Sequence, residues 1–168
     1  MKKIIFLLFF TLVSINANAG CDDPIGDGVD YTNCRFSDGQ DLAGSYLPNS
    51  NLSFSTFIQV NFDKSIMMNS ILAFGTFSES SFIRANLYES NLQGSNLENS
   101  SFVSANLTRA NFTGATLIGV NFENSNLIEA NLTSSNISGA NFKNANLNGA
   151  IWTNGKICGK DSIGECKD

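Results

Sequence analysis

The sequence predicts a repeat fold built from five-residue units, and two regularities carry that prediction. Every fifth residue from Leu42 to Trp152 is apolar, over 23 consecutive positions. The residue two places before each apolar position is Ala, Ser or Gly in 20 of the 23 units, and the residue directly before it is Asn in 13 of them. A frame held over this length without a slip is an internal repeat, which decides the architecture before any local pattern does.

A period of five fits neither the helical period of 3.6 nor the strand period of 2. The Asn, Ser and Gly residues in every unit also disfavour helix. A five-residue unit that turns a corner can instead show its apolar and small residues to one interior, with the other three positions facing water.

Residues twenty positions apart share chemical character, which predicts how the units stack. After Leu42, five Phe residues follow at a spacing of 20, from Phe62 to Phe142. Aromatic rings at strand spacing pack offset on one another, so this ladder is what stacked coils require. The other predicted inward columns are Leu47, Met67, Leu87, Leu107, Leu127 and Leu147; Leu52, Leu72, Leu92, Phe112, Leu132 and Trp152; and Phe57, Phe77, Leu97, Leu117, Ile137 and Ile157.

Units such as Ala105–Arg109, Ala110–Gly114 and Ala130–Ser134 resemble the pentapeptide-repeat family, whose motif is Ala-(Asp/Asn)-Leu-x-x. The resemblance implies an all-β fold, a right-handed parallel quadrilateral β-helix in which four pentapeptides make one 20-residue coil. Residues 41–157 would then form a solenoid of about 5.5 coils, roughly 26 Å long at strand spacing.

Residues 1–19 are predicted to be a secretory signal peptide, because two lysines precede the apolar run 4–13 and small residues end the segment at 17–19. The run is too short to span a membrane as a mature helix. We therefore expect an exported protein, periplasmic or extracellular. Two alternatives stay open: an N-terminal helix of the fold, and a lipoprotein signal that lipidates Cys21, although Asn18 stands where such a signal has an aliphatic residue.

The four cysteines lie two at each end, in the predicted N-terminal cap 20–40 and C-terminal cap 158–168. An even count in an exported chain predicts disulfides, and a bond across the rod is excluded by disulfide geometry. The predicted pairs, Cys21–Cys34 and Cys158–Cys166, would stabilise caps that cover the open ends of a solenoid.

Metal sites are the rival interpretation of both caps. A zinc site would have to use two distant cysteine pairs that lack a Cys-x-x-Cys spacing. A calcium loop at Asp27–Asp30 lacks the regular carboxylate spacing and the closing Glu. We expect solvated turn residues there, and no metal or cofactor.

The first coils depart from the motif at positions that should face outward. Ile66 and Ile71 replace the usual Asn, and Met68, Phe54 and Phe74 occupy outer positions. Phe54 and Phe74 are twenty residues apart and should stack. Two interpretations remain: a distorted coil or a surface covered by the cap, and a patch that binds a protein partner or a second copy of the chain.

The later coils are predicted to be polar outside. Their Asn columns are expected to form hydrogen-bonded ladders, and Arg109 is expected to form a charge ladder with Glu89 and Glu129. The Asn columns are Asn86, Asn106, Asn126 and Asn146, and Asn91, Asn111 and Asn131.

The chain has no His and no phosphate-cradling Gly loop, so nothing in it supports catalysis. A carboxylate pair for glycoside chemistry, Glu89 and Glu129, would lie on a convex rod with Arg109 between them. We therefore predict a non-catalytic exported structural or protein-interaction module, without a membrane span.

The family resemblance supplies the alternative of a DNA mimic that engages type II topoisomerases and protects them from quinolones. Export argues against it, and so does the net charge of the repeat, where seven acids face four bases. A net of -3 is sparse beside duplex DNA, which carries one charge per ~1.7 Å. The acidic surface also disfavours direct binding of nucleic acid.

Overall fold

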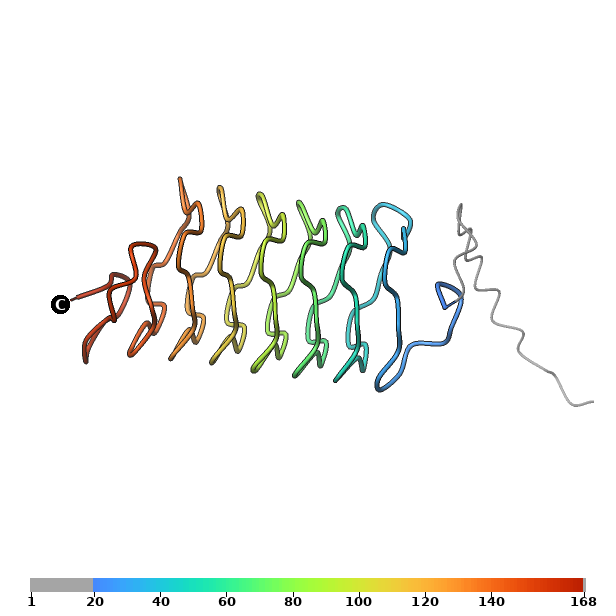
Figure 1. The fold of residues 1–168 in the computed structure, drawn as a ribbon, viewed down its shortest axis with the longest axis horizontal. Coiled ribbons are helices and arrows are strands. Elements are labelled where there is room, and N and C mark those ends of the chain that lie inside the picture. The colour runs from blue at the N-terminus through green and yellow to red at the C-terminus, as the bar shows by residue number, and fades with distance from the viewer. Residues whose placement is uncertain (1–19, 168) are drawn as a thin grey trace, which may run out of the picture.

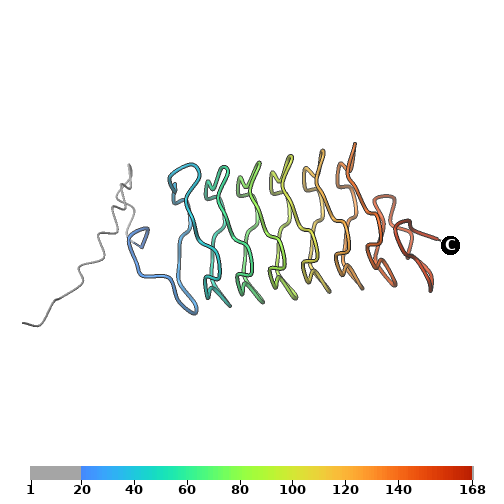
Figure 2. The ribbon, with the colours of Figure 1, turned by 180° about the vertical axis from the view of Figure 1, so that it is seen from behind.

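The computed structural model describes residues 20–167, which form a rod of stacked coils with the termini of the described chain at opposite ends (Figures 1 and 2). The predicted signal peptide, 1–19, lies outside the described residues. Within the described range the backbone pairs through single-residue bridges, which are parallel from coil to coil, with no longer strand and no α-helix. Asn86, for example, bridges Ile66 on one side and Asn106 on the other. The 20-residue period predicted from the sequence is therefore confirmed.

Each five-residue unit combines one turn with backbone pairing to the coils on either side. The amide of Ala85 donates to the carbonyl of Phe82 at 3.0 Å, and Arg84 between them has a φ of 59°. A positive φ at the third residue is the signature of a type II turn. The amide of Phe82 donates to Ser101 in the next coil at 2.7 Å. Turns and bridges together satisfy the polar backbone of a unit that contains no regular secondary structure.

The small residue of each unit is small because it lies inside the coil beside the apolar residue. Ser90 and Ser100 are buried, and their hydroxyls donate to the carbonyls of Leu87 and Leu97, at 2.8 and 2.6 Å. Alanine at the same position has no polar group to satisfy. The alternation of Ala and Ser in the sequence therefore has a direct cause: either side chain fits, and the serine hydroxyl can bond to its own turn.

The predicted Phe ladder forms along the interior of the rod. Consecutive rings from Phe62 to Phe142 stack with centroids 4.7–5.5 Å apart and planes within 17° of each other. Phe57 and Phe77 stack in a second column at 5.2 Å. Phe62, Phe82, Phe102 and Phe122 are fully buried. Stacking adds to the burial of apolar area, which is the main stabilising term of this fold.

The first turn of the solenoid begins earlier than the sequence frame indicates. Asp30 and Arg35 already make parallel bridges to the next coil, with an offset of 21 residues, and Tyr31 and Phe36 are buried in the interior. The register returns to normal by Gly39, so one extra residue is accommodated after Phe36. The interpretation of 20–40 as a non-repeating cap was therefore wrong for its second half, because a one-residue insertion hides the repeat.

The other end of the solenoid closes earlier than predicted. Ile157 does not continue its column: its side chain is 68% exposed and its backbone forms an antiparallel bridge with Ile151. Trp152 is partly buried against Phe142, with ring centroids 5.2 Å apart. The chain reverses after Trp152 and pairs along the edge of the last coil, where the amide of Leu147 donates to Ser162 at 2.8 Å. A reversed chain covers the sheet edge that would otherwise stay unpaired.

Both predicted disulfides are present, Cys21–Cys34 at one end and Cys158–Cys166 at the other. The first joins the start of the described chain to the first coil, and the second closes a short loop within the reversed C-terminal segment. No helix among residues 20–167 has the length and hydropathy of a membrane span.

Candidate functional site: an outer apolar face on the first coils

Large apolar side chains lie exposed on the outside of the first coils, and we call this group the outer apolar face. It consists of Tyr46, Phe54, Ile66, Ile71 and Phe74. The most exposed are Phe54 at 57%, Tyr46 at 54% and Phe74 at 52%. About half of each of these residues is therefore exposed to water, whereas the other Phe residues within 20–167 are buried.

The structure places four of the five predicted patch residues in this face and leaves one aside. Met68 is half-buried and so is not part of the exposed face. Ile83 and Tyr88, which also directly follow an inward apolar residue, are half-buried as well. Tyr46 was missed from the sequence, although it lies twenty residues before Ile66 and bridges it. Its place in the column where later coils carry Asn was the available signal.

Phe54 and Phe74 form a stacked pair on the surface, with ring centroids 5.3 Å apart and planes 14° from parallel. Both residues have left-handed backbone, with φ of 60° and 59°. That conformation costs an L-residue roughly 1–2 kcal/mol, and a bulky side chain there is uncommon. Later coils place Gly94, Gly114 and Ser134 at the equivalent positions. The aromatic pair therefore occupies positions where the fold itself favours glycine.

Gly94 continues this column and gives the Phe74 ring a flat support. A Cβ added to Gly94 would lie 2.6 Å from Cε1 of Phe74, which is closer than real contacts allow. The ring therefore packs directly against the glycine backbone of the next coil. The Phe54–Phe74 stack therefore packs on Gly94, so the two rings are already ordered before a partner binds.

Tyr46, Ile66 and Ile71 extend the apolar area beside the aromatic pair. Ile71 belongs to the same five-residue side as Phe74, and Ile66 to the side before it. Tyr46 and Ile66 are joined by a parallel bridge, so they lie in adjacent coils. The face therefore extends over two consecutive sides of neighbouring coils.

Neither a distorted coil nor coverage by the cap explains this face among the described residues. The coils keep their regular register here, since Ile66 and Ile71 bridge Asn86 and Asn91 twenty residues on. Residues of the predicted cap do bond beside the face, as the amide of Asn33 does to the carbonyl of Ser53 at 3.1 Å, but the side chain of Phe54 stays exposed. The face is neither a distortion nor a surface covered by residues 20–40.

Comparison with known proteins supplies the family. A model of pentapeptide repeats matches residues 41–72, 80–117 and 117–154, with eight copies. The chain belongs to the pentapeptide-repeat family. A comparison with curated proteins found no match.

Two solved structures are similar to this pentapeptide-repeat chain. Rfr23, a pentapeptide repeat protein from the cyanobacterium Cyanothece 51142, is 23% identical, with a TM-score of 0.49; the match covers 75% of this chain and 86% of that one. A trypsin-treated form of QnrB1, a plasmid-mediated fluoroquinolone resistance protein, is 21% identical, with a TM-score of 0.43; the match covers 75% and 69%.

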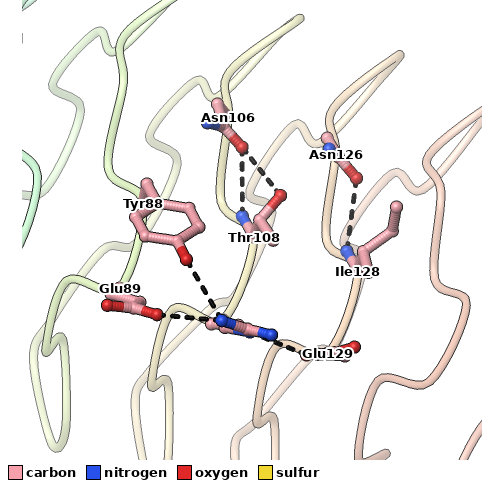
Figure 3. A network of polar contacts seen from close by, with 8 residues as sticks. Tyr88, Glu89, Asn106, Thr108, Asn126, Ile128 and Glu129 are labelled. Atoms are coloured by element: carbon pink, nitrogen blue, oxygen red, sulfur yellow. Dashed lines mark hydrogen bonds and ion pairs between the residues drawn. The ribbon is translucent and has the colours of Figure 1, made fainter.

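The later pentapeptide repeats carry the predicted charge ladder (Figure 3). Nε of Arg109 contacts Oε2 of Glu129 at 2.7 Å, and Nη1 contacts Oε1 of Glu89 at 3.2 Å and the hydroxyl of Tyr88 at 3.1 Å. Lys143 and Glu123 form a further pair across one coil, at 2.8 Å. Exposed pairs of this kind contribute little to stability.

The same contacts argue against acid–base chemistry at this ladder. Hydrogen bonding from the Tyr88 hydroxyl and from the Arg109 guanidinium lowers the pKa of Glu89. The hydrogen bonds that Arg109 donates to Glu129 and Glu89 raise the pKa of its guanidinium above the usual value. A general acid of glycoside hydrolysis needs a raised carboxyl pKa, and Glu89 is shifted in the opposite direction.

The Asn side chains of the repeats form hydrogen bonds mainly within their own turns. Side-chain ladder bonds join Asn106 to Asn86 at 3.0 Å and Asn111 to Asn91 at 3.3 Å. The more frequent contact is local: Oδ1 of each Asn accepts the amide two residues on, as Asn106 does from Thr108 at 3.3 Å (Figure 3). The predicted ladders therefore exist in part, and Asn precedes the apolar residue chiefly because it caps the following turn. The other contacts of this local type in the later coils include those of Asn91, Asn96, Asn111, Asn121, Asn126, Asn131, Asn136, Asn141 and Asn146.

Proposed function

We propose that this pentapeptide-repeat protein is an exported, non-catalytic module that binds another protein through its outer apolar face. The observation that carries the proposal is the surface pair Phe54 and Phe74, stacked on each other in left-handed backbone positions. Exposed apolar groups of this size mark contact surfaces, and rigid aromatic side chains supply much of the energy of protein interfaces. A second copy of the chain is one partner that would fit the same face.

Export is supported by the composition of residues 1–19 and by the two disulfides, which are typical of oxidising compartments. We propose residues 1–19 as a cleaved signal peptide, the residues before the first bridged coil at Asp30 and residues 158–168 as caps, and a periplasmic or extracellular location. Because Cys21 bonds to Cys34, its sulfur is not available for lipidation. We also infer that the solenoid is the right-handed quadrilateral β-helix of the family; four bridged units per coil support this.

The absence of enzymatic activity is proposed on chemical grounds. The chain contains no His, and hydrogen bonds from Tyr88 and Arg109 lower the pKa of Glu89, one of the two carboxyls considered for catalysis. The resemblance to the family points the same way, because its members serve as binding modules.

The alternative, a DNA mimic that binds topoisomerases, has less support. Five charged residues of the later coils form ion pairs with one another, Arg109 with Glu89 and Glu129, and Lys143 with Glu123. Paired charges weaken the regular negative field that a mimic of duplex DNA needs. The likeness to QnrB1 extends to the fold alone.

The binding proposal is tested by the double variant Phe54→Asn/Phe74→Asn. Asn accepts left-handed backbone, so the relief of strain offsets the lost stacking and the fold should persist. We expect the variant to lose at least tenfold in affinity for a partner recovered from the exported fraction, or to lose self-association in sedimentation. The matched control is Lys64→Asn/Arg84→Asn, which alters the same turn position on another side of the rod. Equal binding by both double variants and the wild type contradicts the proposal.

Export is tested separately by the intact mass of the protein from its host, with a thiol-trapping reagent. A chain that begins near Gly20 and has no trapped thiol supports export and two disulfides. A chain that keeps Met1 and has four free thiols overturns export and makes a topoisomerase assay the next step. An acyl group on Cys21 contradicts the disulfide.

A further inference from the structure

A cavity of about 370 Å³ lies at the N-terminal end of the rod, away from the outer apolar face. Its floor is the open end of the solenoid interior, formed by one residue from each inward column. These four residues are Leu42, Leu47, Leu52 and Phe57. The volume is within the range of small-molecule sites.

The cap forms a roof over this cavity without filling it. The Cys21–Cys34 disulfide fixes the start of the roof. The hydroxyl of Tyr31 donates to the backbone carbonyl of Asp23 at 2.7 Å, which fixes the next residues of the roof. Ile25, part of the same segment, is 44% exposed and lines the cavity. A roof held at two points is pre-organised, so a ligand would bind without first having to order the loop.

The opposite end of the rod shows that closure does not require a cavity. There the chain reverses after Trp152, pairs with the last coil and packs directly on the interior, with Ser162 and Cys158 buried. The end near the cap instead keeps space above the first coil. The two ends of the solenoid are therefore closed differently, and the N-terminal closure leaves room for a ligand.

The lining combines an apolar interior with acidic residues and no basic one. Tyr31, Phe36, Pro24 and Ile25 add apolar wall to the floor, and the polar lining residues are Asp22, Asp23 and Gln40. Asp23 lies next to the buried Tyr31, whose hydroxyl donates to its backbone carbonyl, and burial together with the negative charge of Asp23 raises the pKa of Tyr31.

From this geometry we propose that the end cavity binds a small amphiphile, with its apolar body against the solenoid core and a cationic ammonium head near Asp22 and Asp23. The apolar body gains by leaving water, and the acidic residues select a positive head over a negative one. This site is independent of the proposed protein-binding face, because the two share no residue.

The test uses octyltrimethylammonium and octyl sulfate, both below micelle formation, as probes with the same chain and opposite heads. Binding to the protein with both disulfides intact is measured by calorimetry. We expect saturable one-to-one binding of the cation, at least tenfold tighter than that of the sulfate. Equal binding of the two probes, or no saturable binding, overturns the proposal.

Two variants separate the cavity from other surfaces. Leu42→Phe extends the ladder of Phe62 by one ring into the cavity, so it should fold and lose the cation. Asp22→Asn/Asp23→Asn keeps the cavity and should weaken cation binding at least tenfold. The face variant Phe54→Asn/Phe74→Asn should bind as the wild type does. Unchanged binding by Leu42→Phe places the probe elsewhere and contradicts the proposal.

Discussion

The coils of residues 41–80 and those of residues 81–150 share one interior and differ on the outside. Both keep the 20-residue register and the buried apolar columns. Where the first coils expose Phe54 and Phe74, the later coils place Gly94 and Gly114; where the first carry Ile66, the later carry Asn. The interior specifies the fold in both halves, so the outer positions are free to vary. A departure confined to the outside points to a function that the fold does not need.

The largest effect should come from breaking the shared interior in either half. We expect Phe62→Ala and Phe122→Ala each to lower the free energy of unfolding by about 3–5 kcal/mol, because each leaves a cavity within a stack of rings. Denaturant titration measures both losses. A loss below about 1 kcal/mol at only one site would show that the two interiors are not equivalent.

A smaller effect should distinguish two glycines of the same outer column, Gly94 and Gly114. Gly94→Ala and Gly114→Ala both put a Cβ on left-handed backbone, which costs about 1 kcal/mol. At Gly94 the new methyl also displaces the ring of Phe74, whereas at Gly114 nothing lies within 4 Å. We expect Gly94→Ala to lose about 1 kcal/mol more and to weaken partner binding. Equal losses at the two sites would mean that Phe74 does not pack on Gly94.

The cap of the first coils should show its own pH dependence. The pKa of Tyr31 is raised mainly by burial, so the folded state holds its proton more tightly than the unfolded chain does. This contribution to stability is present below about pH 10 and is lost as the pH rises through the folded pKa. Tyr31→Phe should be less stable than the wild type at pH 8, and the difference should shrink above pH 10. Tyr46→Phe is the control and should follow the wild type; a constant difference for Tyr31→Phe would contradict the assignment.

The smallest effect is expected from the charge ladder of the later coils. Arg109→Ala removes contacts to Glu89 and Glu129, but all three side chains are substantially exposed. We expect the melting temperature to change by about 2 °C or less. A drop as large as that of Phe122→Ala would mean that the outside of the later coils does contribute to the fold.

Much of the interior could be predicted because a five-residue frame and a 20-residue period are visible in the chain. The exceptions lie at the two ends of the solenoid, where an inserted residue and a chain reversal interrupt the repeat. Phe36 was missed because one inserted residue shifts its register, and Ile157 was misplaced because it fits the frame although the chain has already reversed. The role of Asn was partly misjudged, since the spacing cannot show whether its side chain bonds to the next coil or to its own turn.

The outer apolar face could be predicted in part, because Phe54, Ile71 and Phe74 interrupt a polar pattern. Their left-handed backbone and the support from Gly94 required the structure, since the sequence does not report φ. The end cavity could not be predicted at all. It depends on how the cap packs against Leu42 and its neighbours, and no periodic signal describes that packing.

The most direct test of the central claim compares two positions in one outer column, Ile71 in the first coils and Asn131 three coils later. A photo-crosslinking amino acid is placed at one or the other, and the living host is irradiated. The account predicts a discrete adduct of higher mass, with a partner or a second copy, from position 71 alone. Equal adducts from both positions, or an adduct from position 131 alone, would contradict the claim that the first coils carry the binding face.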